Sequence, residues 1–414
     1  MTAEADKPPF LIVAYHYPPD TASGAARPHR LAKYLSRLGH EVNVIATLMK
    51  AAPQPSSQKI HRVRAEIDGA ASKDLSGFIE RCLRKTLFHH DAGVTWIPRV
   101  VAKARSLYPE SEPIVITTAP PATTHVAGLL MKLRYGWPWI ADFRDPLVGN
   151  PFRSHWTTQL IDPWLEKLLF RYADAVIANT DAVANIWRSR FPQWAGKIHL
   201  VWNGFDPEDA ASALPLPSGG PRLLSHMGVI YGDRDPLLII SAIRDSIRDG
   251  LVDPSTLQVR LLGPMLPNSP ETIPALEEIA REGWLELRKE FIPKQEATLI
   301  TQTSHYLLLL DVLGPKAGLQ VPAKLFEYLC VGRPILALTT LGSPLAGILA
   351  KAGIPHLCYY GEATPESRAG IAEFLRLPPD AVAPSEWFQK NFNAVSQAEH
   401  VGNIGRELYN RRRA

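Results

Sequence analysis

Apolar and polar residues along the chain follow two alternating patterns, one typical of buried strands and one typical of helices. Residues 10–15 form a continuous apolar run, as expected of a strand covered on both faces. After a turn at 18–24, apolar residues recur at helical spacing from Leu31 to Leu38, and Gly39 ends that helix. The alternation continues with strands at 41–47, 113–119, 138–143, 175–180 and 198–202 and with helices at 123–135 and 159–172.

A segment rich in proline and glycine interrupts this series at 206–221 and has little apolar periodicity, as in an interdomain linker. A second series begins with a strand at 222–228, and the tail at 385–413 is predicted to be helical. Between them we expect strands at 257–263, 284–292, 306–312 and 334–339 and helices at 236–248, 271–282, 295–302 and 323–331.

Strand and helix patterns in alternation indicate parallel sheets with helices on both faces. The sequence therefore predicts an α/β protein with two tandem Rossmann-like, doubly wound domains that face one another across a cleft. The expected boundaries are a first domain at 1–205, the linker at 206–221, a second domain at 222–384 and a helical tail at 385–414 that returns toward the first domain. Open α/β sheets bind ligands at the carboxyl ends of their strands, so the candidate site is expected there.

The composition is that of an ordinary globular protein and argues against several other classes. The 414 residues are 46% apolar and 21% charged, and a chain of this length is expected to form two domains. Its three cysteines show no paired spacing, which argues against a disulfide framework or a zinc site and favours a reducing cytoplasm. Residues 1–9 are too polar for a signal peptide, and no apolar run reaches the roughly 20 residues that span a bilayer. A net charge of +4 is too small to predict nucleic acid as the main partner.

Three candidate chemical sites lie in the first domain. The turn with Gly24 lets the backbone approach a phosphate or a sugar, although a plain tight turn is equally consistent. His125 lies one turn into a helix that follows a strand, where an imidazole can exchange protons near neutral pH, and a structural histidine is the alternative. Asp142, Arg144 and Asp145 end a buried strand, where they can hydrogen-bond sugar hydroxyls or form an ion pair that fixes the loop.

A fourth candidate site lies in the second domain, where a short helix is expected to begin near Pro322. Its N-terminus would present free N–H groups and a partial positive charge to a diphosphate. Glu327 can accept both hydroxyls of a ribose and Lys324 can offset phosphate charge, although both fit equally well as solvated helix residues. Gly228 ends the first strand of this domain, and Arg234 on the following loop can bind a phosphate bidentately.

Residues 72–108 are less regular and rather basic. One interpretation is a surface that meets an anionic or lipid-linked substrate at the inner face of a membrane. The alternative is a solvated helical face with a few packed aromatic residues. The residues in question are Lys73, Arg81, Arg84, Lys85, Arg99, Lys103 and Arg105, with the aromatic residues Phe88 and Trp96.

Several motifs follow one another along the chain. They are Tyr17-Pro18-Pro19 with Gly24, residues 27–35, Gly39-His40-Glu41-Val42, residues 139–146, residues 173–180, Asn203-Gly204-Phe205-Asp206, and residues 321–328 with Gly332-Arg333-Pro334. Taken in this order, they resemble the motifs of the retaining glycosyltransferases of family 4, which have the GT-B architecture. Each motif alone is a moderate signal, and their order makes the resemblance, which covers nearly the whole chain, specific.

The resemblance implies an acceptor-side first domain and a second domain that binds a nucleotide-diphosphate sugar. Gly24 would line the donor phosphates from the first domain, and Glu327 would bind the ribose. Backbone N–H groups of Gly318, Leu319 and Gln320 would hold the diphosphate. Leu319 stands where the family carries the earlier of two glutamates eight positions apart, a residue that meets the donor sugar. The identity of the sugar is therefore left open.

The remaining roles also follow from the resemblance. His125 falls near the acceptor-side histidine of the family. Arg234 matches the phosphate-binding arginine only approximately, because no basic residue follows it closely, and Lys324 would supply the missing charge. The implied reaction retains the anomeric configuration through a same-face displacement without a protein nucleophile. No metal or other cofactor is expected, because these cations and the helix N-terminus would stabilise the leaving diphosphate.

The implied acceptor is a glycan, a lipid-linked molecule or a small molecule, and any membrane contact would be peripheral. Two other hypotheses stay open. One is another enzyme of the same fold, such as an inverting transferase or a nucleotide-sugar epimerase. The other is a non-catalytic nucleotide-sugar binding protein, which the leucine at position 319 favours.

Overall fold

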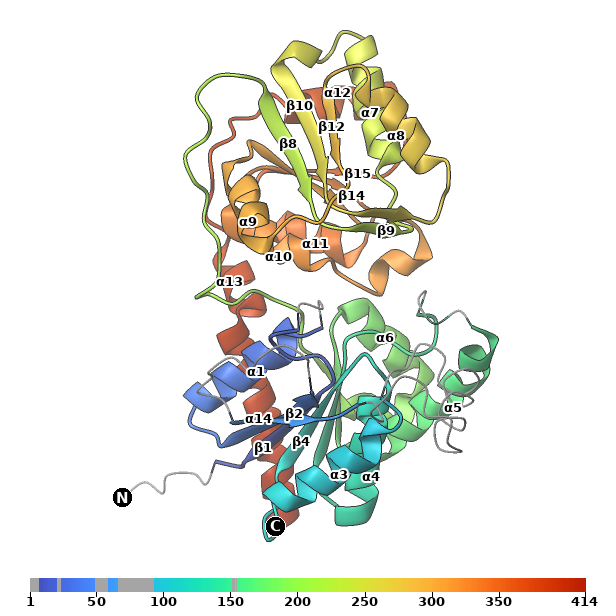
Figure 1. The fold of residues 1–414 in the computed structure, drawn as a ribbon, viewed down its shortest axis with the longest axis vertical. Helices are drawn as coiled ribbons and strands as arrows, with labels where there is room; N and C mark the ends of the chain where they lie inside the picture. The colour runs from blue at the N-terminus through green and yellow to red at the C-terminus, as the bar shows by residue number, and fades with distance from the viewer. Residues whose placement is uncertain (1–6, 21–23, 49–58, 66–92, 151–152, 154) are drawn as a thin grey trace. The chain divides into compact units, whose positions relative to one another are not determined.

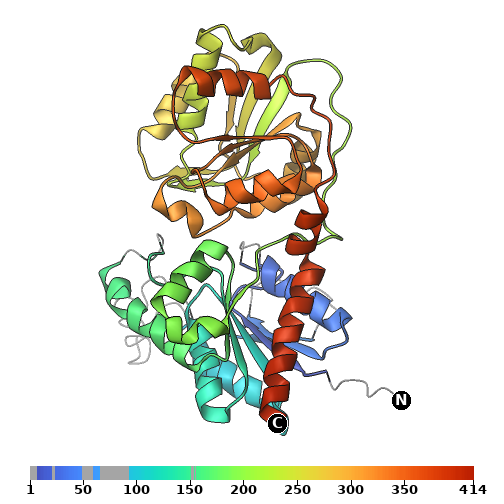
Figure 2. The ribbon, with the colours of Figure 1, turned by 180° about the vertical axis from the view of Figure 1, so that it is seen from behind.

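The chain folds into two compact α/β units. The computed structural model describes residues 7–20, 24–48, 59–65, 93–150, 153 and 155–414. Unit 1 comprises Met1–Asn203 together with Ala394–Ala414, and unit 2 comprises Gly204–Asn393. Figures 1 and 2 show each unit as a sheet flanked by helices. All strand pairs in both main sheets are parallel, so the predicted α/β class with doubly wound sheets is confirmed.

Unit 1 is built around a seven-stranded sheet with the order β3-β2-β1-β4-β5-β6-β7. Strand β3 was not predicted, because its residues alternate between polar and apolar and it lies half-buried at the edge of the sheet. The other strands are mainly apolar, and all of them except β7 are fully buried. The strands are β1 (Phe10–Ala14), β2 (Val42–Thr47), β3 (Lys59–Val63), β4 (Ile114–Ala119), β5 (Trp139–Phe143), β6 (Ala175–Ala178) and β7 (Ile198–Leu200).

Helices cover both faces of this sheet. The C-terminal helix α14 packs beside α1 on one face, where Ala398, Val401 and Ile404 join the core formed by Phe10 and Ile12 of β1. Helices α3, α4 and α5 pack in a row on the other face. The helices of unit 1 are α1 (Ala26–Arg37), α3 (Trp96–Leu107), α4 (Thr123–Tyr135), α5 (Trp156–Tyr172), α6 (Asp181–Arg190) and α14 (Ala394–Arg413), with a 3₁₀ helix at Pro192–Lys197.

Unit 2 contains a six-stranded sheet with the order β12-β10-β8-β13-β14-β15 and a two-stranded sheet of β9 and β11. Strand β15 was not predicted, because it is an edge strand and most of its residues are only half-buried. The strands are β8 (Arg222–Met227), β9 (Ile230–Gly232), β10 (Leu257–Leu262), β11 (Met265–Pro267), β12 (Leu285–Arg288), β13 (Tyr306–Leu310), β14 (Ile335–Leu338) and β15 (His356–Tyr359).

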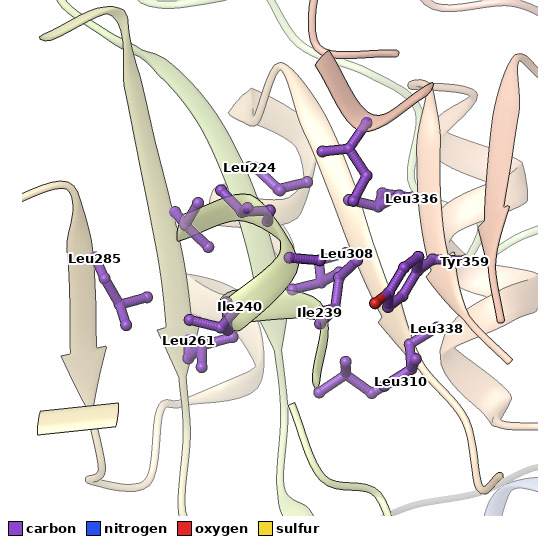
Figure 3. Packing of buried hydrophobic residues seen from close by; sticks show 14 of the residues in the cluster. Leu224, Ile239, Ile240, Leu261, Leu285, Leu308, Leu310, Leu336, Leu338 and Tyr359 are labelled. Carbon is purple, nitrogen blue, oxygen red and sulfur yellow. The ribbon is translucent and has the colours of Figure 1, made fainter. Parts of the chain in front are cut away.

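The core of unit 2 lies between its sheet and helix α7. Figure 3 shows Ile240 beside Leu261 of β10 and Ile239 beside Leu308 of β13, and all four side chains are fully buried. Helices α7, α8 and α12 pack in a row, and α9 contacts α10. The helices are α7 (Leu237–Arg248), α8 (Thr272–Ala280), α9 (Lys294–Thr303), α10 (Ala323–Val331), α11 (Pro344–Ala352), α12 (Pro365–Phe374) and α13 (Glu386–Phe392), with 3₁₀ helices at Pro254–Thr256 and Pro315–Gly318.

Each sheet has a point where the strand order reverses. In unit 1 it lies between β1 and β4, and in unit 2 between β8 and β13. Chain segments that leave two such neighbouring strands run in opposite directions, which opens a crevice at the carboxyl ends of the strands. The residues that follow β1, β4, β8 and β13 are therefore the ones that the fold places at candidate ligand sites.

Candidate functional site

Two of the predicted residues in unit 1 lie in direct contact. A Cβ atom added to Gly24 would come within 2.7 Å of Nη1 of Arg144, so a larger residue at this position would displace the guanidinium. Burial lowers the pKa of Arg144, and the neighbouring carboxylates of Asp145 and Asp142 oppose that shift. The turn after β1 and the loop after β5 thus place the backbone of Gly24 directly beside the buried guanidinium of Arg144.

Asp142 is fully engaged by a residue that the sequence did not single out as its partner. Arg27, in the first turn of α1, donates from Nε and Nη2 to both carboxylate oxygens at 2.8–3.2 Å, and Thr118 donates a further hydrogen bond at 2.9 Å. Burial alone would raise the pKa of Asp142, but the charge and hydrogen bonds of Arg27 lower it below its ordinary value. Of the two interpretations of Asp142, the structure favours the ion pair, with Arg27 and not the nearby Arg144 as its partner.

Arg27 also ties the ion pair to the end of the sheet. Its Nη1 donates to the carbonyl oxygen of Trp202 at 2.7 Å, and its Nη2 donates to that of Val201 at 3.0 Å. Both members of the pair are buried, with 8% of Arg27 and 1% of Asp142 exposed. The pair therefore holds α1, β5 and the segment after β7 together at the edge of the sheet where the candidate site lies.

His125 belongs to a buried hydrogen-bond chain. Nε1 of Trp139 donates to Oγ1 of Thr117 at 2.8 Å, and this hydroxyl lies 2.7 Å from Nδ1 of His125. We assign the hydroxyl hydrogen to Nδ1, since this tautomer uses both the acceptor and the donor capacity of Thr117, and it places the imidazole proton on Nε2. Nε2 is buried and has no hydrogen-bond partner among the described residues. The chain thus leaves one unsatisfied N–H donor at the start of α4.

The environment of His125 corrects one sequence expectation. The imidazole is fully buried and its ring lies 4.1 Å from the ring of Phe143. Burial lowers the pKa of His125 to about 3, although the charge of Asp142 acts in the opposite direction. The expected exchange of protons near neutral pH does not fit a ring that stays neutral there. The geometry supports a neutral hydrogen-bond donor at this position.

The predicted residues of unit 2 converge at the start of α10. Gly228 has a φ of +133°, which favours glycine, and an added Cβ would come within 3.0 Å of Cε of Lys324. Nζ of Lys324 donates to Glu327 at 3.1 Å, and the two side chains are 32% and 60% exposed. Helix α10 begins after Pro322, and no described side chain caps its N-terminus. A half-exposed lysine, an accessible carboxylate and the N–H groups of an uncapped helix therefore share one edge of unit 2.

Arg234 is anchored at the same edge by one neighbour. Its guanidinium lies 4.7 Å from the centre of the Tyr231 ring, and Nη1 donates to the tyrosine hydroxyl. Nε of Arg234 is buried and has no hydrogen-bond partner among the described residues. The guanidinium is therefore oriented by an aromatic ring while part of its donor capacity stays unused.

Two further polar residues at this edge were missed by sequence reasoning. His226, near the end of β8, lies 3.0 Å from the carbonyl oxygen of Leu308 through Nδ1, while its buried Nε2 has no described partner. Burial, together with the charges of Lys324 and Arg234, lowers the pKa of His226 to about 4. Asp311 follows β13, and burial raises its pKa to about 6. The signal that could have revealed both is a polar residue at the carboxyl end of an otherwise apolar strand.

The loop before α10 carries the other predicted donor residues. Gly318 ends the 3₁₀ helix, and Leu319 and Gln320 follow it as half-buried residues in the short connection to α10. Their position after β13 places them at the point where the strand order of unit 2 reverses. The aliphatic side chain of Leu319 offers no hydrogen bond to a sugar.

The basic segment 72–108 is described only in part. Lys73, Arg81, Arg84, Lys85 and Phe88 lie outside the described residues. In the described part, Trp96 is fully buried at the start of α3 and its ring lies 5.4 Å from that of Tyr15, so the interpretation with packed aromatic residues fits this helix.

No group of three or more His, Cys, Asp or Glu side chains among the described residues is placed to hold a metal ion. None of the described helices combines the length and the apolar content needed to cross a membrane.

Comparisons with known proteins agree with both the motifs and the fold. Residues 25–209 match the sequence model of Glycosyltransferase Family 4. The comparison with curated protein sequences gave no match. The chain is similar to sucrose-phosphate synthase from Thermosynechococcus elongatus, with a TM-score of 0.61 at 15% identity over 97% of this chain and 99% of that chain.

Two other solved structures resemble the chain over almost its full length. One is the catalytic domain of starch synthase IV from Arabidopsis thaliana bound to ADP and acarbose, with a TM-score of 0.58 at 12% identity over 98% of this chain and 99% of that chain. The other is an α,α-trehalose-phosphate synthase (UDP-forming) from Burkholderia vietnamiensis, with a TM-score of 0.59 at 12% identity over 97% of this chain and 98% of that chain. The resemblance to family 4 is therefore confirmed over residues 25–209, and the fold of the chain is the GT-B fold of these glycosyltransferases.

Proposed function

We propose that the protein transfers a sugar from a nucleoside-diphosphate sugar to a glycan, lipid-linked or small-molecule acceptor, with retention of the anomeric configuration and without a metal ion. The observation that carries the proposal is the contact of Gly228 with Lys324 at the uncapped N-terminus of α10, with Arg234 close enough that its charge and that of Lys324 both act on His226. Backbone without a side chain, two cations and free N–H groups are the features that bind a diphosphate.

Binding of the donor would replace the ion pair between Lys324 and Glu327 with contacts to the donor. The diphosphate would draw Nζ of Lys324 away from Glu327, whose exposed carboxylate could then accept the ribose hydroxyls. The unused Nε of Arg234 would donate to a phosphate oxygen while Tyr231 keeps the guanidinium in place. Because Lys324 exchanges its ion pair with Glu327 for two phosphate charges, binding favours the exchanged state.

Transfer itself would depend on stabilising the leaving group. As the bond between sugar and diphosphate breaks, negative charge grows on the diphosphate, where Lys324, Arg234 and the N-terminus of α10 stabilise it. One phosphate oxygen then accepts the proton of the attacking hydroxyl. In unit 1, His125 would contribute a hydrogen bond from Nε2 to a sugar hydroxyl and would not act as a general base, because burial keeps its imidazole neutral by lowering its pKa.

A donor panel tests the binding half of the proposal. Glu327→Ala is expected to weaken the binding of the preferred sugar nucleotide by at least about tenfold, since the ribose loses a charge-assisted partner. The matched control is Glu373→Ala, another exposed glutamate on a helix of unit 2, which should leave the affinity unchanged. Equal affinity in wild type and Glu327→Ala by calorimetry would remove the ribose role.

The product of the reaction tests the chemical half. NMR of the purified product should show the anomeric configuration of the donor. An inverted product would identify an inverting transferase, and a free epimerised sugar nucleotide would identify an epimerase. Tight donor binding without turnover on any acceptor would support a non-catalytic binding protein, the hypothesis that Leu319 favours.

A further inference from the structure

Helix α5 carries a row of large apolar side chains on its exposed surface. Trp156, Leu160, Trp164 and Leu168 follow one another at intervals of four residues and are 65%, 63%, 75% and 42% exposed. Residues four apart lie on the same face of a helix, so these four form one continuous strip along α5. In Figure 1, α5 lies at the right-hand margin of unit 1. Contiguous apolar surface of this kind marks a binding surface.

The charges of α5 are sorted between its two faces. Both acidic residues point inward: Asp162 is 3% exposed and pairs with Arg153 at 2.6 Å, and Glu166 is fully buried and pairs with Arg190 at 2.5 Å. The exposed face carries Lys167 and Arg171 and no acidic residue of the helix. Helical spacing places both cations within the apolar strip, in its last two turns.

The inward-facing ion pairs also fix the orientation of α5. Glu166 accepts N–H groups of Leu147 and Val148 at 3.0 and 3.2 Å in addition to its pair with Arg190. Asp162 is held bidentately by Arg153 at 2.6 and 2.7 Å. These contacts attach the helix to the body of unit 1 through the face opposite the strip. The same contacts fix the direction in which α5 presents its two tryptophans, away from the face that the ion pairs hold.

The neighbouring helix extends the apolar surface. Helix α4 packs beside α5, and its residues Leu130 and Leu133 are 42% and 56% exposed. Arg134 is exposed next to them and adds another positive charge. The surface formed by Trp156, Leu160, Trp164, Leu168, Leu130 and Leu133 with Lys167, Arg171 and Arg134 is called the α5 surface below.

We propose that the α5 surface docks on a lipid bilayer that contains anionic headgroups, with α5 lying in the plane of the membrane interface. Tryptophan is the side chain that favours this interface, because its ring is apolar and its N–H still meets water. Leucines beside it enter the upper acyl region, and lysine and arginine reach up to the headgroups. The absence of acidic residues on the exposed face of α5 removes the repulsion that anionic lipids would otherwise meet.

The same charges argue against a second copy of the chain as the occupant. A two-fold dimer buries the same patch from both copies, so Lys167 and Arg171 of each copy would enter one apolar contact. Like charges brought together in an apolar contact cost free energy, and no acidic residue on the exposed face of α5 is available to compensate them. A bilayer supplies the opposite charge at the required depth. This proposal concerns where the protein docks and holds independently of the sugar that it transfers.

Flotation of the full-length protein with vesicles tests the proposal without any sugar donor. Wild type should float with vesicles of equal parts phosphatidylcholine and phosphatidylglycerol. Trp156→Ser with Trp164→Ser should lower the partition coefficient by at least about tenfold, because two interfacial rings are lost. Lys167→Gln with Arg171→Gln should lower it about fivefold per residue on these vesicles and have little effect on pure phosphatidylcholine.

The controls distinguish docking through the α5 surface from nonspecific adsorption by exposed apolar residues and from misfolding. Phe291→Ser and Leu341→Ser remove side chains in unit 2 that are 76% and 74% exposed, and neither should change flotation. All variants alter exposed positions, so their melting temperatures should stay close to that of wild type. Failure of wild type to float, or an equal loss in the control variants, would overturn the proposal. The proposal would also be overturned if wild type did not bind vesicles and formed a dimer that the tryptophan substitutions convert to a monomer. That result would identify the surface as a site of self-association.

Discussion

Replacing Arg27 with methionine should destabilise unit 1 strongly, because it leaves a carboxylate buried without its cation. Methionine keeps the apolar part of the side chain and removes the five N–H donors. Asp142 would retain the hydrogen bond from Thr118 and lose those from Nε and Nη2 of Arg27. Breaking a buried ion pair from one side costs about 3–5 kcal/mol, which corresponds to a fall in melting temperature on the order of 10 °C for a unit of this size.

The cost of this substitution should depend on pH, and its sign follows from Asp142. In wild type the folded-state pKa of Asp142 lies below 3.8, so the pair contributes stability above that pH and loses it as the pH falls through the folded pKa. In Arg27→Met, burial acts without the cation and raises the pKa, so the folded variant takes up a proton on mild acidification. The difference in unfolding free energy between wild type and variant should therefore be largest at neutral pH and shrink as the pH is lowered.

Urea unfolding followed by tryptophan fluorescence measures this difference. Of the ten tryptophans, all except Trp284 and Trp387 lie in unit 1, so the signal reports chiefly on that unit. The matched control is Lys59→Met, which removes the cation of the exposed pair with Glu41, whose side chains are 64% and 53% exposed. This control should cost less than about 1 kcal/mol. A loss in Arg27→Met no greater than that of the control, or a loss independent of pH, would refute the assignment of a buried pair.

Three other substitutions test separate parts of the account. Thr117→Val should lower the unfolding free energy by about 2 kcal/mol or more, because it leaves two buried nitrogens unsatisfied. Thr117→Ser keeps the hydroxyl and should retain the stability of wild type. Equal unfolding free energies in the two variants would contradict the hydrogen-bond chain. Gly228→Ala should displace Lys324 and weaken diphosphate binding by about tenfold or more, while Gly283→Ala, also at positive φ but in open space, should not; calorimetry decides. The folded-state pKa of Asp311 is about 6 against 3.8 unfolded, so wild type should lose about 3 kcal/mol of unfolding free energy as the pH rises through this interval. Asp311→Asn should lack that loss, and an unchanged pH profile in urea unfolding would contradict it.

The sequence predicted the strands that are buried on both faces and missed two edge strands of the main sheets, β3 and β15. The run Tyr306–Leu310 is recognisable because every position must be apolar, and it forms β13. Strands β3 and β15 lie at the edges of their sheets, where solvent permits charged and polar residues, so no continuous apolar run marks them. Their existence depends on a neighbouring strand that a local pattern does not contain.

The candidate site divides in the same way between local and distant contacts. Lys324 and Glu327 are three residues apart on one helix, so their proximity follows from helical spacing. Arg27 and Asp142 are separated by 115 residues, and no local pattern in a single sequence pairs them. The neutral state of His125 depends on burial by segments on other elements, which the position of the residue in its helix does not reveal.

The most direct test of the diphosphate site is a calorimetric titration of the full-length protein with a panel of nucleoside diphosphates in the presence of a chelator of divalent cations. The account predicts that one diphosphate binds with a stoichiometry of one per chain. It further predicts that Lys324→Met and Arg234→Met each weaken binding by at least about tenfold, since each removes a charge-assisted hydrogen bond. Binding of no diphosphate, or equal affinity in wild type and both variants, would contradict it.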